Sequence, residues 1–542
     1  MFDSDALASL FPTPLGIPEE HQLSEPIHQR RYLVDGELKT WAGSLKTVLS
    51  PICVRTPKGE VQQVLVGSYP LMTEVESDAA LAAAVKAYDH GRGEWPTKSV
   101  AERIDCMQTF VAGMKKRREL IVNLIMWEIG KSLADSRKEF DRTVEYIQAT
   151  IAALKDLDNR SSRFEVVEGT IGHIRRTPLG VVLCMGPYNY PLNETFCTLI
   201  PALLMGNTVV FKPPQYGTLL FEPLLDVFKE SFPAGVINTV YAPGQLVVPR
   251  LLASGKVDVL ALIGSSRVAD HLKKQHPKSN RLRAILGLDA KNAAIVLPDA
   301  DIDLAVKECL AGALSFNGQR CTALKMLIVH RSIVDRFLQR FTEELGKLKV
   351  GMPWETGVNI TPLPGPHRTA YMTEALDDAR AKGARVINGG GGSFNTTLFY
   401  PAVVYPVTPD MQLYREEQFG PLVPVMAYDD VETALDYVIT SDHGQQVSIF
   451  GNDPAEIGAL VDPLVNQVCR VNLNCQCQRG PDVFPFAGRK DSAEGTLSVA
   501  DALRAFSIRS MVATKTSDAD KALLNGIVRD HQSKFINTGF IL

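Results

Sequence analysis

Short apolar runs alternate with longer amphipathic segments through most of this chain, and this alternation limits the folds that it can adopt. In the first series, strands are predicted at 180–184, 208–211, 236–241 and 257–262, with helices at 192–205 and 219–230. In the second series, strands are predicted at 293–297 and 325–329, with helices at 302–315 and 332–347. Such a pattern is typical of parallel sheets covered by helices on both faces. We therefore predict an α/β protein with two doubly wound parallel-sheet domains and a cleft between them.

Composition excludes several classes of protein. The chain has 542 residues, of which 45% are hydrophobic, and this is enough for two or more well-buried domains. Its net charge of −4 provides no basic field for nucleic acid. No apolar run approaches the roughly 18 to 20 residues that span a bilayer, and the first residues do not form a secretory signal. We expect a cytoplasmic protein without nucleic-acid or membrane partners.

The cysteines favour reduced thiols over a disulfide framework. There are nine of them, an odd number, and most lie inside apolar runs. Cys475 and Cys477 flank one residue, but no second cysteine pair or histidine pair accompanies them. We therefore predict no metal site.

Three motifs carry the chemistry of the chain. They are Gly186 to Pro191 (GPYNYP), Ser315 to Thr322 (SFNGQRCT) and Glu416 to Pro421 (EEQFGP). Cys321 is a nucleophile if a nearby cation or helix N-terminus favours its thiolate, and otherwise it is a buried apolar cysteine. Together the three motifs resemble the aldehyde dehydrogenase superfamily. The arginine before Cys321 and the tyrosine after Asn189 narrow the resemblance to its NADP-dependent, non-phosphorylating glyceraldehyde-3-phosphate dehydrogenase branch.

The resemblance implies two catalytic residues. Cys321 would attack the aldehyde carbon and form a thiohemiacetal. The side-chain amide of Asn189 and the backbone N–H of Cys321 would stabilise the oxyanion that develops on the substrate. The alternative for Asn189 is a turn or cap residue, because asparagine is common in both places.

The resemblance also implies how a cofactor would bind. Lys212, at the end of a strand, would hold the adenosine ribose, and Gln215 stands where NAD-using relatives often have glutamate. A neutral side chain does not repel a 2′-phosphate, so we expect NADP, with NAD possible. Ser265 matches the turn that meets the pyrophosphate at a helix N-terminus. Glu417 would bind the nicotinamide ribose, and the Phe419 ring would border the nicotinamide.

Three further residues that match the family imply a negatively charged substrate. Tyr190, Arg320 and Arg479 correspond to residues that bind the phosphate of glyceraldehyde 3-phosphate, and Arg160 or Arg163 could add another guanidinium. Arginine suits this task because its planar fork donates twice to phosphate oxygens. Each arginine taken alone is equally consistent with an ordinary surface ion pair. The implied reaction is the oxidation of glyceraldehyde 3-phosphate to 3-phosphoglycerate through a thioester.

One position departs from the family pattern. Relatives have a Glu-Leu-Gly-Gly-Lys motif whose glutamate activates water to release the acyl group, but here alignment on Lys291 places Gly287 at that glutamate. The only carboxylate between Arg281 and Pro298 is Asp289. Four interpretations remain open: Asp289 or another carboxylate replaces the glutamate, coenzyme A accepts the acyl group, turnover is slow, or the protein binds ligands without turnover.

The domain division follows from the strand pattern and the resemblance. We predict an N-terminal arm (1–40), a cofactor-binding domain (41–155 and 178–287) and a catalytic domain (288–505). Alternating apolar residues predict strands within 156–177 and 506–516, and in relatives such strands form a small oligomerisation extension. We accordingly expect a homodimer or homotetramer. Residues 517–542 form a C-terminal extension that the resemblance does not explain.

Overall fold

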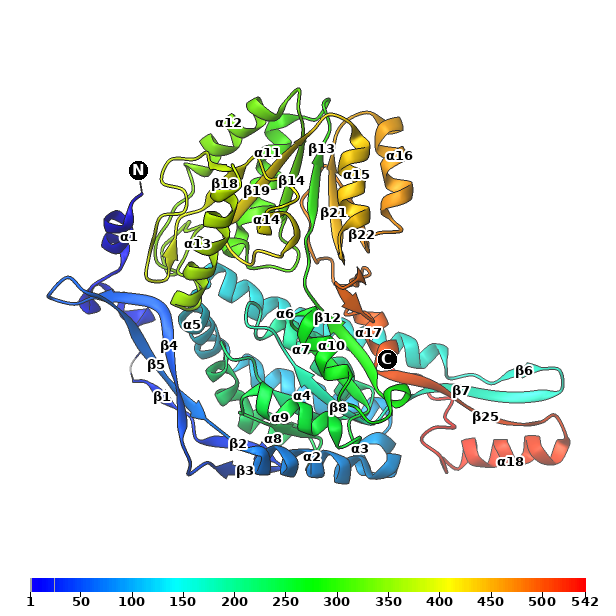
Figure 1. Ribbon diagram of the computed structural model, residues 1–542. Coiled ribbons are helices and arrows are strands. Elements are labelled where there is room, and N and C mark those ends of the chain that lie inside the picture. The colour runs from blue at the N-terminus through cyan, green and yellow to red at the C-terminus, as the bar shows by residue number, and fades with distance from the viewer. Residues whose placement is uncertain (1, 24) are drawn as a thin grey trace.

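Two mostly parallel sheets organise the chain, as predicted. The computed structural model describes residues 2–23 and 25–542, and it shows two α/β lobes joined beside an outlying hairpin (Figure 1). The strands of the first sheet follow the order β10-β9-β8-β11-β12-β24, and only β24 runs antiparallel to its neighbour. Their bounds are β8 (Val181–Met185), β9 (Thr208–Lys212), β10 (Ile237–Thr239), β11 (Val259–Ile263), β12 (Arg283–Gly287) and β24 (Ala493–Glu494).

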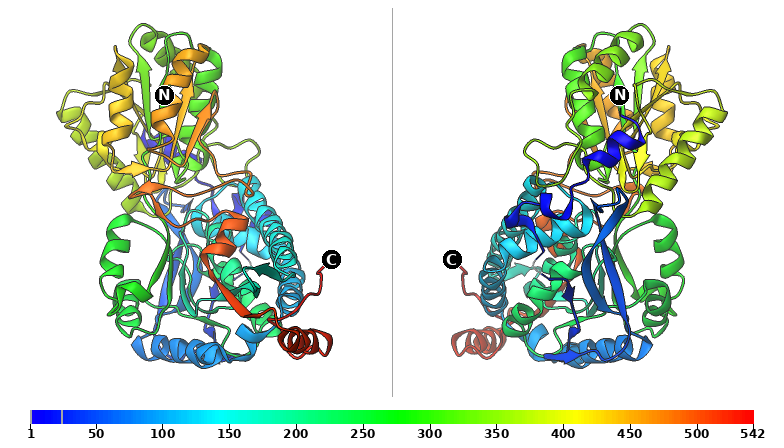
Figure 2. Two further views of the ribbon diagram at one scale, coloured as in Figure 1. Left: turned by 90° about the vertical axis from the view of Figure 1, so that its right-hand side faces the viewer. Right: turned by 90° about the vertical axis from the view of Figure 1, so that its left-hand side faces the viewer.

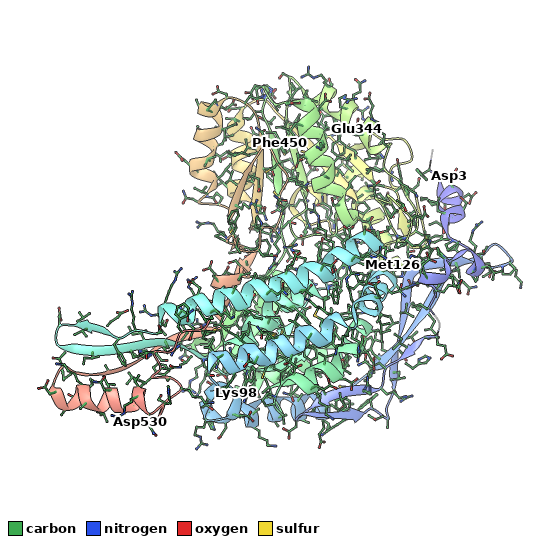
Figure 3. The ribbon with its side chains drawn as sticks, turned by 180° about the vertical axis from the view of Figure 1, so that it is seen from behind. Asp3, Lys98, Met126, Glu344, Phe450 and Asp530 are labelled. Atoms are coloured by element: carbon green, nitrogen blue, oxygen red, sulfur yellow. The ribbon has the colours of Figure 1, made fainter. Side chains whose placement is uncertain are left out.

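Helices cover both faces of the first sheet, and its strands β8 to β11 are buried along almost their whole length. They include α2 (Glu74–Tyr88), α4 (Val100–Lys115), α5 (Arg118–Ile129), α6 (Leu133–Arg160), α7 (Asn193–Leu204), α9 (Gly244–Ala253) and α10 (Ser266–Lys273). Figure 3 shows the long helices crossing the back of this lobe, with Met126 on α5 near the other lobe. The single helix predicted at 219–230 is wrong in detail: a 3₁₀ segment, η4 (Leu219–Leu224), precedes α8 (Leu225–Ser231). Pro223 lies in the 3₁₀ segment and has no N–H for a helical hydrogen bond.

The second sheet has the strand order β15-β18-β19-β14-β13-β21-β22. The bounds are β13 (Ala293–Val296), β14 (Met326–His330), β15 (Arg385–Val386), β18 (Ala402–Tyr405), β19 (Leu422–Tyr428), β21 (Gln446–Phe450) and β22 (Arg470–Leu473). Its helices are α11 (Ile302–Leu314), α12 (Val334–Leu345), α13 (Pro366–Ala381), α15 (Val431–Thr440) and α16 (Pro454–Leu464). α12 buries five apolar residues at three- and four-residue spacing, which is the pattern of one helix face packed on a sheet.

A small sheet projects from the first lobe, with the order β25-β7-β6 (Figures 1 and 2). It contains β6 (Glu165–Val167), β7 (Thr170–Pro178) and β25 (Ser507–Lys515), close to the strands predicted for the extension. The C-terminal residues cover this sheet: α18 (Asp518–Arg529) and the tail bury Leu524 and Ile536 against Ile171. The backbone oxygen of Leu542 accepts a hydrogen bond from Lys155 on α6. The segment that the family resemblance leaves unexplained is therefore a packed part of the fold.

Two boundaries in the structure differ from the predicted division. The segment 493–505, assigned to the catalytic domain, supplies β24 to the first sheet, and α17 (Val499–Ala505) packs on α6 and α7. The N-terminal arm is structured: β1 (Ile27–His28) pairs with β5 (Val61–Pro70), which pairs with β4 (Leu45–Arg55). A hairpin of β2 (Arg31–Val34) and β3 (Glu37–Thr40) follows β1. Among the described residues, no helix is both long and apolar enough to cross a membrane.

Candidate active site

A cavity of about 960 Å³ is lined by residues of both lobes. The first lobe contributes residues at the carboxyl ends of its strands, where ligands of parallel sheets bind: Met185, Lys212, Ile263 and Gly287. The second lobe contributes Cys321, Glu417 and Phe419. The volume is large enough for a cofactor-sized ligand. Residues from all three sequence motifs therefore meet at one cavity.

The turn that precedes Cys321 is held in an unusual backbone conformation. After α11 ends, Phe316, Asn317 and Gly318 all have positive φ, at 50°, 55° and 70°. A Cβ on Gly318 would lie 2.6 Å from the carbonyl oxygen of Gly420, so only glycine fits there. The glycine at position 318 is therefore needed for the turn that leads to Cys321.

Cys321 is half-buried, and its surroundings favour the neutral thiol. Burial raises the pKa of Cys321 to about 11, and the nearby Glu194 carboxylate raises that pKa further while Arg479 and Lys325 oppose the increase. Lys325 is itself fully buried and forms an ion pair with Glu417. The cysteine therefore has cations within electrostatic reach, but its thiol is protonated in the cofactor-free protein near neutral pH.

Asn189 lies in the loop between β8 and α7 with its side chain fixed toward the cysteine turn. Its Nδ2 donates a hydrogen bond of 2.9 Å to the carbonyl oxygen of Gln319. A primary amide has two N–H donors, so the second remains available to a substrate oxygen. Within the described part of the chain, the backbone N–H of Cys321 has no hydrogen-bond acceptor. Asn189 and Cys321 both line the cavity, so two N–H donors of the kind that an oxyanion site requires are available there.

A buried ion pair supports the Asn189 loop from behind. Lys131 and Glu139 are both fully buried and lie 2.5 Å apart, and Lys131 Nζ donates to the carbonyl oxygen of Asn189 at 2.7 Å. Glu139 Oε1 accepts from the backbone N–H groups that begin α7. Lys131 Nζ also lies 3.5 Å from the centre of the Tyr190 ring, a cation–π contact. The position of the oxyanion donor is therefore set by charges that sequence reasoning did not identify.

The far end of the cavity carries positive charge without a carboxylate partner. Lys212 ends β9, and burial lowers its pKa to about 8, with a smaller contribution in the same direction from Lys46 on β4. Among the described residues, neither lysine forms an ion pair with a carboxylate, and the neighbouring Gln215 is neutral and exposed. Two uncompensated cations favour an anionic ligand at this end. Lys46 was not predicted, because it lies about 165 residues earlier in the sequence.

Asp289 is engaged at the start of α10. Its Oδ2 accepts hydrogen bonds from the Ser266 backbone N–H at 2.7 Å and from the Ser266 hydroxyl at 2.9 Å. Ser265 is the N-cap of this helix, lines the cavity and makes no capping bond with its own side chain. Asp289 therefore stabilises a helix N-terminus through its Oδ2.

Gly287 ends β12 and lines the cavity, as the alignment with the missing glutamate predicts. A Cβ built at this position would lie 3.3 Å from Leu497 Cδ1 and at least 3.5 Å from the Ile263 side chain. The neighbouring leucine methyl needs to move only a few tenths of an ångström to admit it. The site thus lacks a carboxylate at 287 although a side chain fits there.

The predicted nicotinamide residues lie together on the second lobe. Glu417 is paired with Lys325, and Lys325 Nζ lies 4.4 Å from the centre of the Phe419 ring. The same ring meets Tyr188 edge to face, with 5.9 Å between centroids. Lys325 was not predicted. It contacts both the Glu417 carboxylate and the Phe419 ring, and it lowers the pKa of Cys321.

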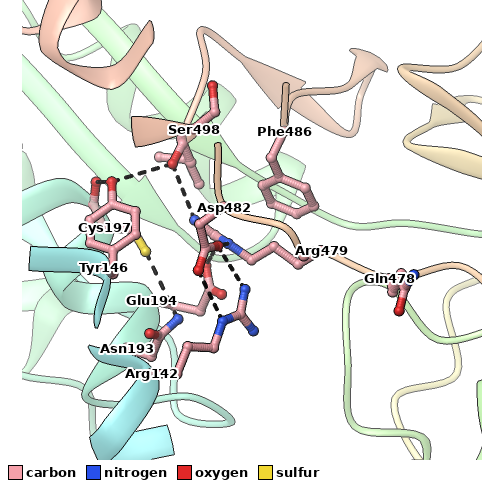
Figure 4. A network of polar contacts seen from close by, with 12 residues as sticks. Arg142, Tyr146, Asn193, Glu194, Cys197, Gln478, Arg479, Asp482, Phe486 and Ser498 are labelled. Atoms are coloured by element: carbon pink, nitrogen blue, oxygen red, sulfur yellow. Dashed lines mark hydrogen bonds and ion pairs between the residues drawn. The ribbon is translucent and has the colours of Figure 1, made fainter. Parts of the chain in front are cut away.

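Arg479 and Arg142 do not line the cavity and belong to a network of polar contacts (Figure 4). Arg479 is buried and forms ion pairs with Glu194 and Asp482, and it also donates to the carbonyl oxygen of Leu497. Arg142 on α6 binds the same Asp482 through two hydrogen bonds of 2.7 and 3.1 Å. The four side chains alternate in sign, so the cluster is neutral overall.

The remaining predicted substrate residues have other partners. Arg320 donates to the carbonyl oxygen of Gly312 at 2.8 Å rather than facing the cavity, and Tyr190 contacts Lys131. On α6, the helix before the hairpin, Arg142 shares its partner Asp482 with Arg479, and Arg160 does not. Arg160 is exposed, pairs with Asp156, and lies 18 residues farther along α6, about 27 Å at the rise of a helix.

Comparison with known proteins agrees with this geometry. The model of the aldehyde dehydrogenase family matches residues 52–512. The chain belongs to the aldehyde dehydrogenase family. It is 33% identical over 466 residues to the NADP-dependent glyceraldehyde-3-phosphate dehydrogenase of Streptococcus equinus, which covers 84% of this chain and 93% of that protein. The pea protein of the same name is 28% identical and covers 90% of this chain and 94% of its own.

Solved structures support the same assignment. The crystal structure of the Bacillus halodurans NADP-dependent glyceraldehyde-3-phosphate dehydrogenase complexed with NADP has a TM-score of 0.82 and 29% identity, covering 91% of this chain and all of that one. Lactaldehyde dehydrogenase from Escherichia coli has a TM-score of 0.81 and 25% identity, covering 91% of this chain and all of its own. The predicted family, the α/β fold class and the assignment as an oxidoreductase of the aldehyde dehydrogenase family are confirmed. Among the described residues of this family member, no cluster of histidine, cysteine and carboxylate side chains forms a metal site, and all nine cysteines are free.

Proposed function

We propose that this chain catalyses the NADP-dependent oxidation of an aldehyde, with glyceraldehyde 3-phosphate as the substrate and 3-phosphoglycerate as the product. The observation that carries the proposal is the single cavity lined by Cys321, Asn189 and Lys212. It combines a thiol, an oxyanion donor and a cation suited to an anionic cofactor. The names of the relatives support both the cofactor and the substrate.

The residues present fit NADP. Among the described residues, no carboxylate pairs with Lys212 or Lys46, and Gln215 does not repel a phosphate. This end of the cavity therefore suits the adenosine with its 2′-phosphate. Glu417 and Phe419 line the opposite end and are suited to the nicotinamide riboside. When bound, NADP accepts the hydride that leaves the substrate carbon. On this basis the first lobe is the cofactor-binding domain, and the second lobe carries the nucleophile.

The residues of the chain act in a defined order. Cys321 must first lose its proton, because a pKa of about 11 leaves it protonated at neutral pH. The thiolate sulfur then attacks the carbonyl carbon, and the free N–H of Asn189 with the Cys321 N–H stabilises the oxygen. Oxidation leaves a thioester on Cys321, and water releases the acid.

Arg479 is the cation with the largest effect on the pKa of Cys321, so it is the arginine that we propose attracts a substrate phosphate. It is already paired with Glu194 and Asp482, so a phosphate would have to share its guanidinium with Glu194. Arg320 would have to leave the Gly312 carbonyl oxygen. The proposal therefore requires side chains to rearrange when a phosphorylated aldehyde binds, which an unphosphorylated aldehyde would not require.

Gly287 favours a second candidate function, transfer of the acyl group to coenzyme A. Without a side chain at 287, water has no base at the position that relatives use. The proposals are separated by mixing the protein with NADP and glyceraldehyde 3-phosphate and following NADPH with and without coenzyme A. Continuous turnover without coenzyme A supports hydrolysis, and turnover only with coenzyme A supports acyl transfer. A single-turnover burst that stops under both conditions would reject both functions and indicate a binding protein.

A further inference from the structure

Release of the acyl group is the unsolved step of the proposed function. Three carboxylates line the cavity: Glu194, Asp289 and Glu417. Both Oδ2 bonds of Asp289 go to Ser266, and Glu417 is paired with Lys325 on the side of the cavity suited to the cofactor. Of the three, only Glu194 lies on the helix that directly follows the Asn189 loop. The inference drawn from it rests on the proposed function.

Glu194 is placed beside the reacting sulfur by the same loop that places the oxyanion donor. It lies in the first turn of α7, and its backbone N–H donates to the carbonyl oxygen of Tyr190, so Asn189 and Glu194 are separated by only one turn of chain. The side chain is buried and faces the cavity. It is the largest electrostatic influence on Cys321, exceeding Arg479, Lys325 and Glu417. Glu194 and Cys321 line the same cavity, so an acyl group on the sulfur would share this space with the carboxylate.

The contacts of Glu194 hold its side chain in one orientation. Its Oε2 is bound by Arg479, whose guanidinium is held in turn by Asp482 and by the carbonyl oxygen of Leu497 (Figure 4). Within the described part of the chain, the other oxygen, Oε1, has no hydrogen-bond partner. A base needs this combination: one oxygen fixed and the other free to accept a proton.

We propose that Glu194 replaces the glutamate that is missing at position 287 and accepts the proton of the water that hydrolyses acyl-Cys321. The water oxygen attacks the thioester carbon while one water proton moves to Glu194 Oε1. The tetrahedral intermediate then collapses, the carbon–sulfur bond breaks, and the sulfur leaves as a thiolate. Glu194 returns its proton to that sulfur, and the carboxylic acid product loses its own proton to solvent. Arg479 is a positioning residue in this step.

The proposal is tested without the cofactor by acetylating Cys321 with p-nitrophenyl acetate. Release of p-nitrophenolate reports acylation, and the mass of the intact protein reports how long the acetyl group persists. In Glu194→Gln we expect acylation at least as fast as in the wild type, because removing a negative charge lowers the pKa of the thiol. The acetyl-enzyme should persist about 10² to 10⁴ times longer, the usual value of a general base. Loss of packing alone does not produce these opposite effects.

Two variants control for disruption of the charge cluster. Asp482→Asn removes the other carboxylate that Arg479 binds, but it does not line the cavity, so its acetyl-enzyme should persist within about threefold of the wild type. Gly287→Glu, added to Glu194→Gln, should shorten the acetyl lifetime again, because the cavity admits a side chain at 287. If circular dichroism shows that Glu194→Gln is unfolded, the wild-type protein provides a second test. Its acetyl group should be lost more slowly in D₂O than in H₂O.

The outcomes are distinct. An unchanged acetyl lifetime in folded Glu194→Gln, equal trapping by Asp482→Asn, or the absence of a D₂O effect on the wild type would overturn the role of Glu194. Failure of the wild type to form any acetyl-Cys321 would instead reject Cys321 as the nucleophile, and with it the proposed function.

Discussion

The reactivity of Cys321 toward an alkylating agent gives the sharpest prediction about the site. With a pKa of about 11, roughly one thiol in 3,000 is ionised at pH 7.5, against roughly one in 30 at the ordinary value of 9.0. In the cofactor-free protein, iodoacetamide should therefore modify Cys321 about a hundred times more slowly than a free cysteine derivative. The rate should increase about tenfold per pH unit from pH 7 to 10, since only the thiolate reacts.

The measurement is mass spectrometry of the peptide that contains Cys321, which separates it from the other eight cysteines. N-acetylcysteine under the same conditions serves as the reference thiol. Lys325→Met should decrease the rate at each pH, because this cation lowers the pKa of the thiol. A rate that reaches its plateau below pH 8 would show that the site stabilises the thiolate, and the electrostatic account of the cysteine would then be wrong.

Three further variants test other parts of the structure. Gln215→Glu should weaken NADP about ten- to a hundredfold more than NAD in calorimetric titration, because its carboxylate repels a 2′-phosphate; equal losses would contradict this reasoning. Asn189→Ala should slow the first-turnover formation of NADPH about 10²- to 10³-fold, and a normal rate would remove Asn189 from the oxyanion site. Lys131→Met leaves the buried Glu139 without its ion-pair partner, so the free energy of unfolding in urea should decrease by about 3 to 5 kcal/mol. Adding Glu139→Gln should recover most of that loss, and no recovery would show that the pair is not the cause.

Much of the fold could be predicted from local pattern. The strand at 293–297 is β13 (Ala293–Val296), and the helix at 302–315 is α11 (Ile302–Leu314), because apolar runs and periodicity mark such elements directly. The return of residues 493–505 to the first lobe could not be predicted in this way. β24 has only two residues, and it exists because it pairs with β12 about 200 residues earlier. Pairing over that separation leaves no signal in the local sequence.

The candidate site shows the same division. Six of the predicted residues line the cavity: Cys321, Asn189, Lys212, Ser265, Glu417 and Phe419. They could be predicted because each lies in a recognisable motif at the end of a strand or helix. Their partners were not predictable. Lys325 pairs with Glu417, and Arg479 pairs with Glu194, across 92 and 285 residues of sequence. A sequence shows which side chains are charged, but the fold determines which opposite charge each one pairs with. In this protein, that pairing determines whether an arginine is available to bind a ligand.

The pairing of β25 with β7 has a consequence for how the chain is made. Nine residue pairs join the two strands, from Ser507 with Pro178 to Lys515 with Thr170, and the covering tail comes later still. During synthesis, the β6–β7 hairpin leaves the ribosome more than 300 residues before its partner strand exists. Until the final residues emerge, Ile171 and the open edge of β7 are exposed to other nascent chains. Synthesis of β25 and the residues that cover it, rather than folding of either lobe, closes this edge of the sheet.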